Sequence, residues 1–255
     1  MNTPKVSIVM PSLNVRPYIE QCIESVLRQT LPDLEIICVD AGSGDGTRQI
    51  LQHYADTDPR VRILDSDRKS YGYQVNLGID AAQGEYLGIV ETDDFAEPDM
   101  FEKLYRTAAE EDLDVCKSGF FFYWSDPAKA DQAAAERAGG DAAVRSWRKA
   151  MEERAQSLPA DGTGVDVPYP MFSDVMASRV FCPVTDFPST IELVDFFNLK
   201  PSIWSAVYKR SFLEEHHIRL NETPGASFQD TAFNFKVWAL ARRVRVPRSM
   251  CSWGV

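Results

Sequence analysis

The chain has 255 residues, of which 44% are hydrophobic and 25% are charged, and its formal net charge is −11 at pH 7. A chain of this size can bury a substantial core as one α/β domain or two smaller ones. The negative charge argues against nucleic-acid binding, which requires a basic face. No apolar run reaches the roughly 20 residues that span a bilayer, and no signal peptide is recognised, so a cytoplasmic location is expected.

The cysteines are widely spaced and form neither a C-x-x-C pair nor a disulfide framework. We therefore expect reduced thiols in the core rather than a metal site. They are Cys22, Cys38, Cys116, Cys182 and Cys251.

Short apolar runs alternate with helical patterns in the first part of the chain. Val6–Met10, Ile36–Val39 and Val61–Leu64 are predicted strands, because each run is brief and rich in β-branched residues. Apolar residues at the spacing i, i+3, i+4 predict helices after the first two strands, with Ile23 and Leu51 on the buried faces. This alternation with short connections predicts a parallel sheet with right-handed crossovers.

A glycine-rich loop follows the second strand and contains Gly42, Gly44 and Gly46. A dinucleotide-binding fingerprint requires G-x-G-x-x-G after the first strand and an acid about 20 residues later. Here the spacing is G-x-G-x-G, and the acid, Asp40, precedes the loop. A Rossmann dinucleotide site is therefore disfavoured, and the sequence has no Walker A motif either.

The helix predicted after the third strand carries Gln74 and Asn76 in its first turns. Pro11 and Asp40 follow the first and second strands. Because parallel strands end at one edge of their sheet, we expect these four residues to meet there and to line a nucleotide-sized cleft.

Tyr86–Val90 is a predicted buried strand that ends in a run of acids, with Glu91, Asp93 and Asp94. Carboxylates packed this closely repel one another unless a cation or a hydrogen-bond donor intervenes. A divalent metal, Mn²⁺ or Mg²⁺, holding a phosphate-bearing ligand is one interpretation. A solvated acidic turn before the helix predicted near Pro98 is the other.

A helix is predicted over Met100–Ala108 and a strand over Val115–Tyr123, whose aromatic run favours core packing. After Trp124 the chain is rich in Ala, Asp, Glu and Arg, so residues 128–156 are either a solvated helical excursion or a mobile segment. We treat this region as an insertion. An amphipathic helix is predicted at Ile191–Phe197.

Asp230 stands at the predicted start of a late helix whose apolar face includes Phe233 and Val237. The unpaired N–H groups of a helix start stabilise an acid there. A plain helix cap and a functional carboxylate are both open interpretations.

Five blocks of the chain together resemble the family 2 glycosyltransferases. They are Val6–Asn14, Val39–Thr47, Asn76–Gly78, Gly84–Tyr86 and Glu91–Asp94. The resemblance implies a GT-A (Rossmann-like) α/β single domain, with a central, mostly parallel sheet flanked by helices and a helical or loop insertion. It divides the chain into a nucleotide-sugar-binding α/β half at 1–124, a variable insertion at 125–190 and an acceptor-side segment at 191–255.

The predicted site residues combine this resemblance with the positions at the sheet edge. Nucleotide-sugar binding is assigned to Pro11, Ser12, Asn14, Asp40, Gly42, Ser43, Gln74, Asn76, Glu91, Thr92 and Asp93. By resemblance Asp93 and Asp94 hold the metal. Two departures stand out, because Ala41 replaces a family Asp that often contacts uracil, and Glu91 replaces the first Asp of Asp-x-Asp-Asp.

Residues 229–233 resemble the family's Glu-Asp-x-x-Phe, in which the Asp is the catalytic base, so Asp230 is the expected base. The implied reaction is a metal-dependent, inverting transfer of a sugar from a UDP-linked or other nucleoside diphosphate sugar to an acceptor hydroxyl. The expected setting is bacterial-type polysaccharide or glycoconjugate synthesis, with a saccharide or lipid-linked saccharide as acceptor. Trp204 is predicted either to stack on the acceptor or to pack in the core.

Two other functions remain as alternatives. A nucleotidyltransferase would also use metal-bound carboxylates, but the sequence lacks the glycine-rich, basic N-terminal loop expected of one. A non-catalytic sugar-nucleotide-binding domain is the second alternative.

A basic run near the end of the chain has two interpretations as well. It consists of Arg242, Arg243, Arg245 and Arg248. These arginines either contact anionic lipid head groups at the inner face of the membrane or form an ordinary solvated helix end.

Overall fold

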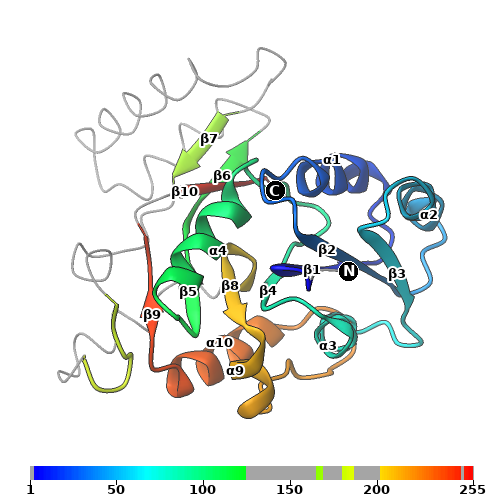
Figure 1. Cartoon of the computed structure of the whole chain (residues 1–255). Coiled ribbons are helices and arrows are strands. Elements are labelled where there is room, and N and C mark those ends of the chain that lie inside the picture. The colour runs from blue at the N-terminus through cyan, green and yellow to red at the C-terminus, as the bar shows by residue number, and fades with distance from the viewer. Residues whose placement is uncertain (1–2, 125–164, 169–179, 187–201, 248–249, 255) are drawn as a thin grey trace, which may run out of the picture.

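The computed structural model describes residues 3–124, 165–168, 180–186, 202–247 and 250–254 (Figure 1). Seven of its strands form one sheet in the order β3-β2-β1-β4-β8-β5-β9. They are β1 (Val6–Ser12), β2 (Leu34–Asp40), β3 (Val61–Asp65), β4 (Tyr86–Ile89), β5 (Val115–Lys117), β8 (Ala206–Lys209) and β9 (Val244–Arg245). A second sheet has the order β10-β6-β7, with β10 at Met250–Gly254, β6 at Gly119–Trp124 and β7 at Val165–Pro168.

The large sheet is mostly parallel, as predicted. β1 runs parallel to β2 and β4, β2 runs parallel to β3, and β5 runs parallel to β9. Only β8 is antiparallel to its two neighbours, β4 and β5. The predicted GT-A-type α/β architecture is thus confirmed.

Helices cover both faces of the large sheet. They are α1 (Arg16–Leu27), α2 (Thr47–Thr57), α3 (Tyr71–Ala81), α4 (Met100–Glu110), α9 (Arg210–Glu215) and α10 (Gln229–Leu240), with the short η1 at Ile203–Ser205. Apolar side chains of α1, α2 and α4 form one core cluster with one face of the sheet. Those of α3, α9 and α10 form a second cluster on the other face, below the sheet in Figure 1.

Each strand contributes side chains to both clusters, because successive side chains of a strand point to opposite faces of the sheet. In β1, Ile8 and Met10 belong to the first cluster, whereas Val9 belongs to the second. Val9 also explains why α3 carries a glycine. A Cβ on Gly78 would lie 2.3 Å from Val9 Cγ1, so only glycine lets the helix lie this close to the sheet.

Two predicted strand boundaries were wrong. β1 continues past Met10 to Ser12, because Pro11 and Ser12 still pair with β2 and the Pro11 carbonyl accepts a bond from Thr92 Oγ1 at 2.8 Å. The strand predicted over 115–123 is broken at Ser118, whose N–H donates to the Ser205 carbonyl at 2.8 Å. β5 and β6 therefore enter different sheets.

The segments predicted at 1–124 and 191–255 share one sheet, since β8 lies between β4 and β5. The predicted helix at Ile191–Phe197 and all of residues 128–156 lie outside the described residues. Within the described part of the chain, no helix is long and apolar enough to cross a membrane. Cys22, Cys38 and Cys116 are buried, as expected of core thiols, whereas Cys182 is half-buried.

Two of the late arginines have partners within the fold. The Arg243 guanidinium donates to the backbone carbonyls of Glu111 and Asp112, at 2.7 and 3.1 Å for the closer bonds. Arg245 forms an ion pair with the Glu111 carboxylate. These contacts account for Arg243 and Arg245 without a lipid surface.

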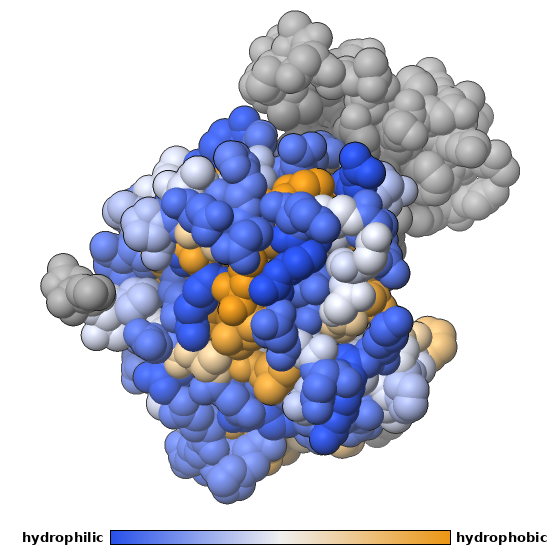
Figure 2. All heavy atoms as spheres, turned by 90° about the vertical axis from the view of Figure 1, so that its right-hand side faces the viewer, coloured by the Kyte–Doolittle hydropathy of each residue, from blue (hydrophilic) through white to orange (hydrophobic). Residues whose placement is uncertain are grey.

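The face formed by the first strand and helix units is mostly hydrophilic (Figure 2), in keeping with the net charge of the chain. A small apolar strip lies near the middle of this face.

Candidate active site

The loops that follow β1 and β2 are tied to each other. Asn14 has a left-handed backbone (φ 55°), which asparagine tolerates better than most residues. Its Oδ1 accepts a hydrogen bond from Gly44 N, and its own N–H donates to Ser43 Oγ, both at 2.9 Å. The N-terminus of α1 is held by the same loop, since Arg16 N donates to Asp45 Oδ2 at 3.0 Å. The two loops thus form one platform at the sheet edge.

Asp40, the last residue of β2, is 3% exposed. Its Oδ2 accepts hydrogen bonds from the N–H groups of Gly42 and Ser43 at 3.2 and 3.1 Å. Its buried Oδ1 has no hydrogen-bond partner among the described residues. A buried carboxylate oxygen without a donor is costly in a folded protein, so this atom points to a water or a ligand that donates to it.

The acidic loop after β4 is fixed in place by side chains of α1 and by Gln29, two residues after the end of this helix. Cys22 Sγ donates to the Glu91 carbonyl at 3.4 Å, and Ser25 Oγ accepts from Ala96 N at 3.0 Å. Gln29 donates to the Glu97 carbonyl at 2.6 Å. The backbone of this loop is therefore held by α1 and by the residue Gln29 that follows it.

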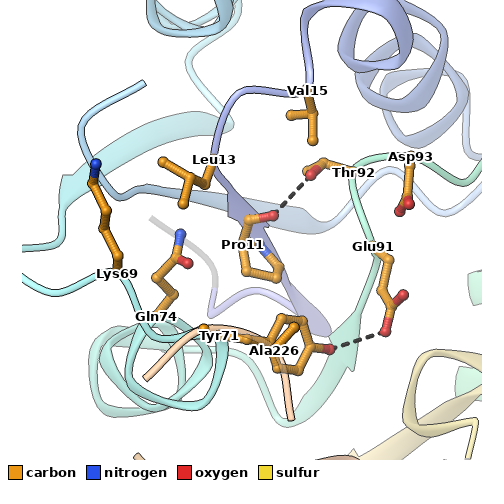
Figure 3. Close-up of a pocket in the computed structure, with 11 residues that line it drawn as sticks. Pro11, Leu13, Val15, Lys69, Tyr71, Gln74, Glu91, Thr92, Asp93 and Ala226 are labelled. Carbon is orange, nitrogen blue, oxygen red and sulfur yellow. Dashed lines mark hydrogen bonds between the residues drawn. The ribbon is translucent and has the colours of Figure 1, made fainter. Parts of the chain in front are cut away.

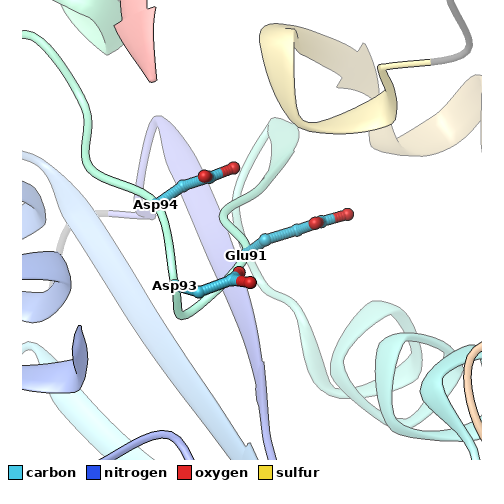
Figure 4. A group of neighbouring side chains, drawn as sticks. All are labelled: Glu91, Asp93 and Asp94. Carbon is cyan, nitrogen blue, oxygen red and sulfur yellow. The ribbon is translucent and has the colours of Figure 1, made fainter. Parts of the chain in front are cut away.

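Glu91, Asp93 and Asp94 converge at this loop, with one oxygen of each within 4.8 Å of the others (Figure 4). Asp94 is buried, Glu91 is half-buried and Asp93 is exposed. Burial raises the pKa of the neighbouring Cys22 thiol, and the charges of Asp94 and Asp93 raise it further. Three carboxylates at this separation, all with hard oxygen donors, fit a Mg²⁺ or Mn²⁺ ion.

A cavity of about 310 Å³ opens beside these acids (Figure 3). Its size is at the lower end of the range usual for small-molecule sites. Early and late parts of the chain both contribute to the lining. The early residues come from the end of β1 and the loop after it, from the start of α3 and from the loop after β4. The late residues come from the loop before α10. The lining residues are Pro11, Leu13, Val15, Lys69, Tyr71, Gln74, Glu91, Thr92, Asp93, Gly225 and Ala226.

Tyr71 connects the acidic loop to the late helix. Its hydroxyl donates to Glu91 Oε1 at 3.1 Å, as Figure 3 shows. Burial raises the pKa of Tyr71 well above its usual value, and the charges of Glu91 and Asp230 add to this effect. Asp230 therefore lies close enough to act electrostatically on the same phenol that bonds Glu91.

Asp230 itself is half-buried in the first turn of α10, and its Oδ1 accepts from Thr231 N at 2.8 Å. The N-cap of this helix is Phe228, which adopts a left-handed backbone (φ 53°). Asp230 is thus not the helix cap that the sequence allowed as an interpretation.

Gln229 organises the loop that precedes Asp230. It is 3% exposed, and its Oε1 accepts from Ser227 N at 2.6 Å. Its Nε2 donates to Thr223 Oγ1 at 2.9 Å and to the Gly225 carbonyl at 3.0 Å. A glutamate here would have no N–H to donate to that carbonyl, which explains the amide at this position.

The same loop is docked onto the start of α3. Gly225 N donates to the Lys69 carbonyl at 2.8 Å, and Tyr71 N donates to the Gly225 carbonyl at 3.0 Å. Ser70 Oγ donates to the Thr223 carbonyl at 2.7 Å. These bonds hold Gly225 and Ala226 at the cavity wall.

Apart from Asn76 and Trp204, the predicted site residues fall into three groups. Pro11, Gln74, Glu91, Thr92 and Asp93 line the cavity. Asp94 belongs to the acid cluster, and Asp230 lies near Tyr71. The residues that stand at the adjoining ends of β1 and β2 or in the platform loops are Ser12, Asn14, Asp40, Gly42 and Ser43.

Gln74 and Asn76 hold backbone in place. Gln74 Nε2 donates to the carbonyls of Ser12 and Val39 at 2.8 and 2.7 Å, which ties β1 to β2. Asn76 does not line the cavity. Its Nδ2 donates to the Leu220 carbonyl and its Oδ1 accepts from Leu220 N, each at 2.9 Å. Asn76 therefore has a structural role, because it links α3 to a loop that is distant in sequence.

Trp204 does not line the cavity either. It is half-buried in η1, and its ring meets Phe120 edge-to-face with the centroids 4.7 Å apart. Of the two roles predicted for Trp204, these contacts favour packing.

Sequence reasoning missed Tyr71, Lys69, Gly225 and Ala226 as cavity residues. A tyrosine at a helix start carries no pattern that separates it from a packing residue. Gly225 and Ala226 belong to a loop that is distant in sequence from the acids, and only the tertiary fold brings it there.

Comparison with known proteins supports the sequence resemblance. The sequence model described as "Glycosyl transferase family 2" matches residues 7–170. Over 123 residues the chain is 42% identical to the uncharacterized glycosyltransferase EpsJ of Bacillus subtilis (strain 168), a match that covers 48% of this chain and 36% of EpsJ.

Two solved structures share the fold. Residues 1–349 of S. aureus TarS in complex with UDP superpose with a TM-score of 0.66 at 19% identity, covering 98% of this chain and 60% of that one. The mannosyltransferase PcManGT from Pyrobaculum calidifontis, in complex with GDP-Man and Mn²⁺, gives a TM-score of 0.58 at 16% identity, covering 99% and 57%. The chain thus spans less than two thirds of each of these proteins, and the match to EpsJ spans about a third of that protein.

Proposed function

Because this chain belongs to glycosyl transferase family 2, we propose that it transfers a sugar from a nucleoside diphosphate sugar to an acceptor hydroxyl with inversion at the anomeric carbon. The observation that carries the proposal is that residues from an early and a late part of the chain line one cavity. Its wall includes Glu91 and Asp93 from the loop after β4 and Gly225 and Ala226 from the loop before Asp230.

The nucleoside of the donor is assigned to the platform at the ends of β1 and β2. The unpartnered Oδ1 of Asp40 is buried there and suits a ligand hydroxyl or N–H donor. Pro11, Ser12 and Gln74 keep the strand ends together beside it. TarS binds UDP, and PcManGT binds GDP-Man. We expect UDP to be the nucleotide of this chain.

Glu91, Asp93 and Asp94 would hold a divalent cation against the donor diphosphate, as their spacing and hard oxygen donors suit. When bound, such an ion stabilises the negative charge that develops on the leaving diphosphate. The hydrogen bonds from Cys22 and Gln29 to this loop keep the carboxylates in position before the donor arrives.

Asp230 is the proposed general base. An acceptor hydroxyl is a weak nucleophile until a carboxylate within hydrogen-bond reach takes its proton during attack. As the new C–O bond forms on one side of the anomeric carbon, the bond to the diphosphate breaks on the other. Asp230 does not itself line the cavity, but it stands in the first turn of α10, directly after the loop whose Gly225 and Ala226 do, and this place supports the role.

The test combines binding and turnover. The protein is incubated with Mn²⁺ and a panel of UDP- and GDP-sugars, and release of the nucleoside diphosphate is measured with and without saccharide acceptors. Asp230→Asn should lower turnover about 100- to 10,000-fold, the usual contribution of a general base, while donor affinity stays near that of the wild type.

Asp56→Asn is the matched control, because Asp56 is exposed on α2, away from the cavity lining, and its carboxylate accepts a hydrogen bond from Gln52. An Asp230→Asn protein with wild-type turnover would refute the assignment of the base. Metal-dependent nucleotide binding with no turnover on any substrate would favour the alternative of a sugar-nucleotide-binding domain.

A further inference from the structure

Tyr71 is the first residue of α3 and is held by hydrogen bonds of its backbone N–H and of its side-chain hydroxyl. Its N–H donates to the Gly225 carbonyl at 3.0 Å, and Ser70, the N-cap of the helix, donates to the Thr223 carbonyl. Its ring lines the cavity, and its hydroxyl reaches Glu91 Oε1 at 3.1 Å (Figure 3). The backbone anchor fixes the point from which the side chain reaches the acidic loop.

Glu91 needs such a partner more than its two neighbours do. It is the longest of the three clustered side chains, so its carboxylate has the most rotamers to lose when it faces Asp93 and Asp94. Like charges at this distance also push it away from them. A hydroxyl that donates to one oxygen offsets part of that repulsion and restricts the side chain.

We propose that Tyr71 is a positioning residue of the transfer site, whose hydroxyl holds Glu91 in the orientation that completes the carboxylate cluster. Tyr71 then sets the affinity of the cluster for a divalent cation and, through it, for the donor diphosphate. This inference rests on the proposed function, because it gives Glu91 a role in metal-dependent donor binding.

The chain supplies a close control for the loss of one tyrosine hydroxyl. Tyr105 on α4 also donates to a glutamate, Glu85 Oε2, at 3.0 Å. Glu85 is exposed and neither residue lines the cavity. Tyr105→Phe therefore removes the same kind of bond as Tyr71→Phe, but away from the site.

The experiment is calorimetric titration of UDP and of GDP into each protein, with Mn²⁺ and with EDTA. Tyr71→Phe should weaken Mn²⁺-dependent nucleotide binding roughly tenfold, the lower end of the effect usual for partners of metal ligands. Tyr105→Phe should bind like the wild type. Melting temperatures without ligand should be close for the two variants, since each keeps its ring.

A double-mutant cycle separates positioning from general support of the fold. If Tyr71 acts through Glu91, Tyr71→Phe should cost much less affinity in a Glu91→Gln background than in the wild type. Equal costs in both backgrounds would overturn the inference, and so would unchanged Mn²⁺-dependent binding by Tyr71→Phe. If the wild type bound neither nucleotide in a metal-dependent way, the proposed function would fail and this inference with it.

Discussion

Asp94 is the most buried member of the carboxylate cluster, at 4% exposure. A buried carboxylate held near two others has little solvent to offset its charge, so it gains most from a bound cation. At the scale of single residues, Asp94 is therefore the position where removal of the charge should weaken metal binding most.

Asp94→Asn keeps the shape of the side chain and removes its charge. Mn²⁺-dependent nucleotide binding should weaken by more than about tenfold, since even indirect partners of metal ligands have effects of that size. Asp112→Asn is the control, because Asp112 precedes β5, whose start is level with the start of β4, whereas the acids follow the end of β4. Titration calorimetry with and without Mn²⁺ measures both. Metal-dependent binding that survives in Asp94→Asn would remove Asp94 from the site.

Lys117 is a second residue whose charge is unusual. It is completely buried at the end of β5, and its ammonium contacts the Ser202 carbonyl, Ser202 Oγ at 2.8 Å and Ser205 Oγ at 2.9 Å. All three are neutral oxygens. Burial lowers the pKa of Lys117 to about 7. The lysine ties β5 to the turn that carries Trp204.

This pKa makes stability depend on pH. An unfolded lysine keeps its proton up to about pH 10.4. Between about pH 7 and pH 10 the unfolded chain therefore binds more protons than the folded one, and stability rises with pH. Relative to Lys117→Met, the wild type should gain about 1 kcal/mol of unfolding free energy between pH 7 and pH 8.

Urea unfolding at pH 7 and pH 8 measures this difference. Lys103→Met, at an exposed position of α4, is the control and should show no such change relative to the wild type. A wild-type advantage over Lys117→Met that is the same at both pH values would contradict the prediction.

At the scale of elements, the segment 220–229 braces α3. Leu220 pairs with Asn76, Thr223 with Ser70, and Gly225 with Tyr71. The approach is so close that a Cβ on Gly72 would lie 2.1 Å from the Asn221 carbonyl oxygen. This segment brings the loop before Asp230 to the cavity.

Gly72→Ala tests how far the packing of segment 220–229 against α3 depends on this close approach. Alanine favours an isolated helix by about 1 kcal/mol over glycine, but here the overlap with backbone should dominate and destabilise the fold by about 1–3 kcal/mol. Nucleotide affinity should fall as well, since Gly225 and Ala226 would shift. Urea unfolding and calorimetry measure the two effects.

Gly44→Ala is the matched control, because a Cβ there meets nothing within 4 Å and its backbone is not left-handed. Equal unfolding free energies of Gly72→Ala and Gly44→Ala would show that segment 220–229 can move away from α3 without loss of stability.

The elements of the first half could be predicted well because their signals are local. β2, β3 and β4 follow from brief apolar runs, and the acids after β4 follow from their place at a strand end. The position of β8 in the sheet could not be predicted, because the sequence of a four-residue strand does not indicate which distant strands it pairs with. The break at Ser118 was missed for the same reason, since its cause is a bond to Ser205.

The candidate site was predictable where it rests on motifs and not where it rests on tertiary contacts. Asp40 and the acid cluster stand in recognisable blocks. Tyr71 acts through a hydrogen bond to Glu91, twenty residues away in sequence. Gln229 acts through bonds within its own loop, to Thr223, Gly225 and Ser227, and no sequence pattern shows how that loop folds. Asn76 matched a block of the family, yet its amide is used to hold Leu220.

At the scale of the whole molecule, ligand binding should stabilise the fold, because the proposed site joins both ends of the chain. A ligand at 100 times its dissociation constant adds about 2.7 kcal/mol of stability. For a domain of this size that corresponds to a rise in melting temperature of about 5–10 °C. Thermal melts with UDP and Mn²⁺ should show this rise. Its persistence after addition of EDTA would contradict a metal-dependent site.

The antiparallel β8 also shapes how the protein is made. β4 and β5 leave the ribosome long before residues 206–209, the strand that lies between them. At synthesis rates of about 5–20 residues per second, the growing polypeptide spends several seconds with one edge of β4 and both edges of β5 unpaired. Open edges of this kind invite pairing with other chains, so the emerging polypeptide stays exposed to such pairing until residues 206–209 arrive to cover the facing edges of β4 and β5.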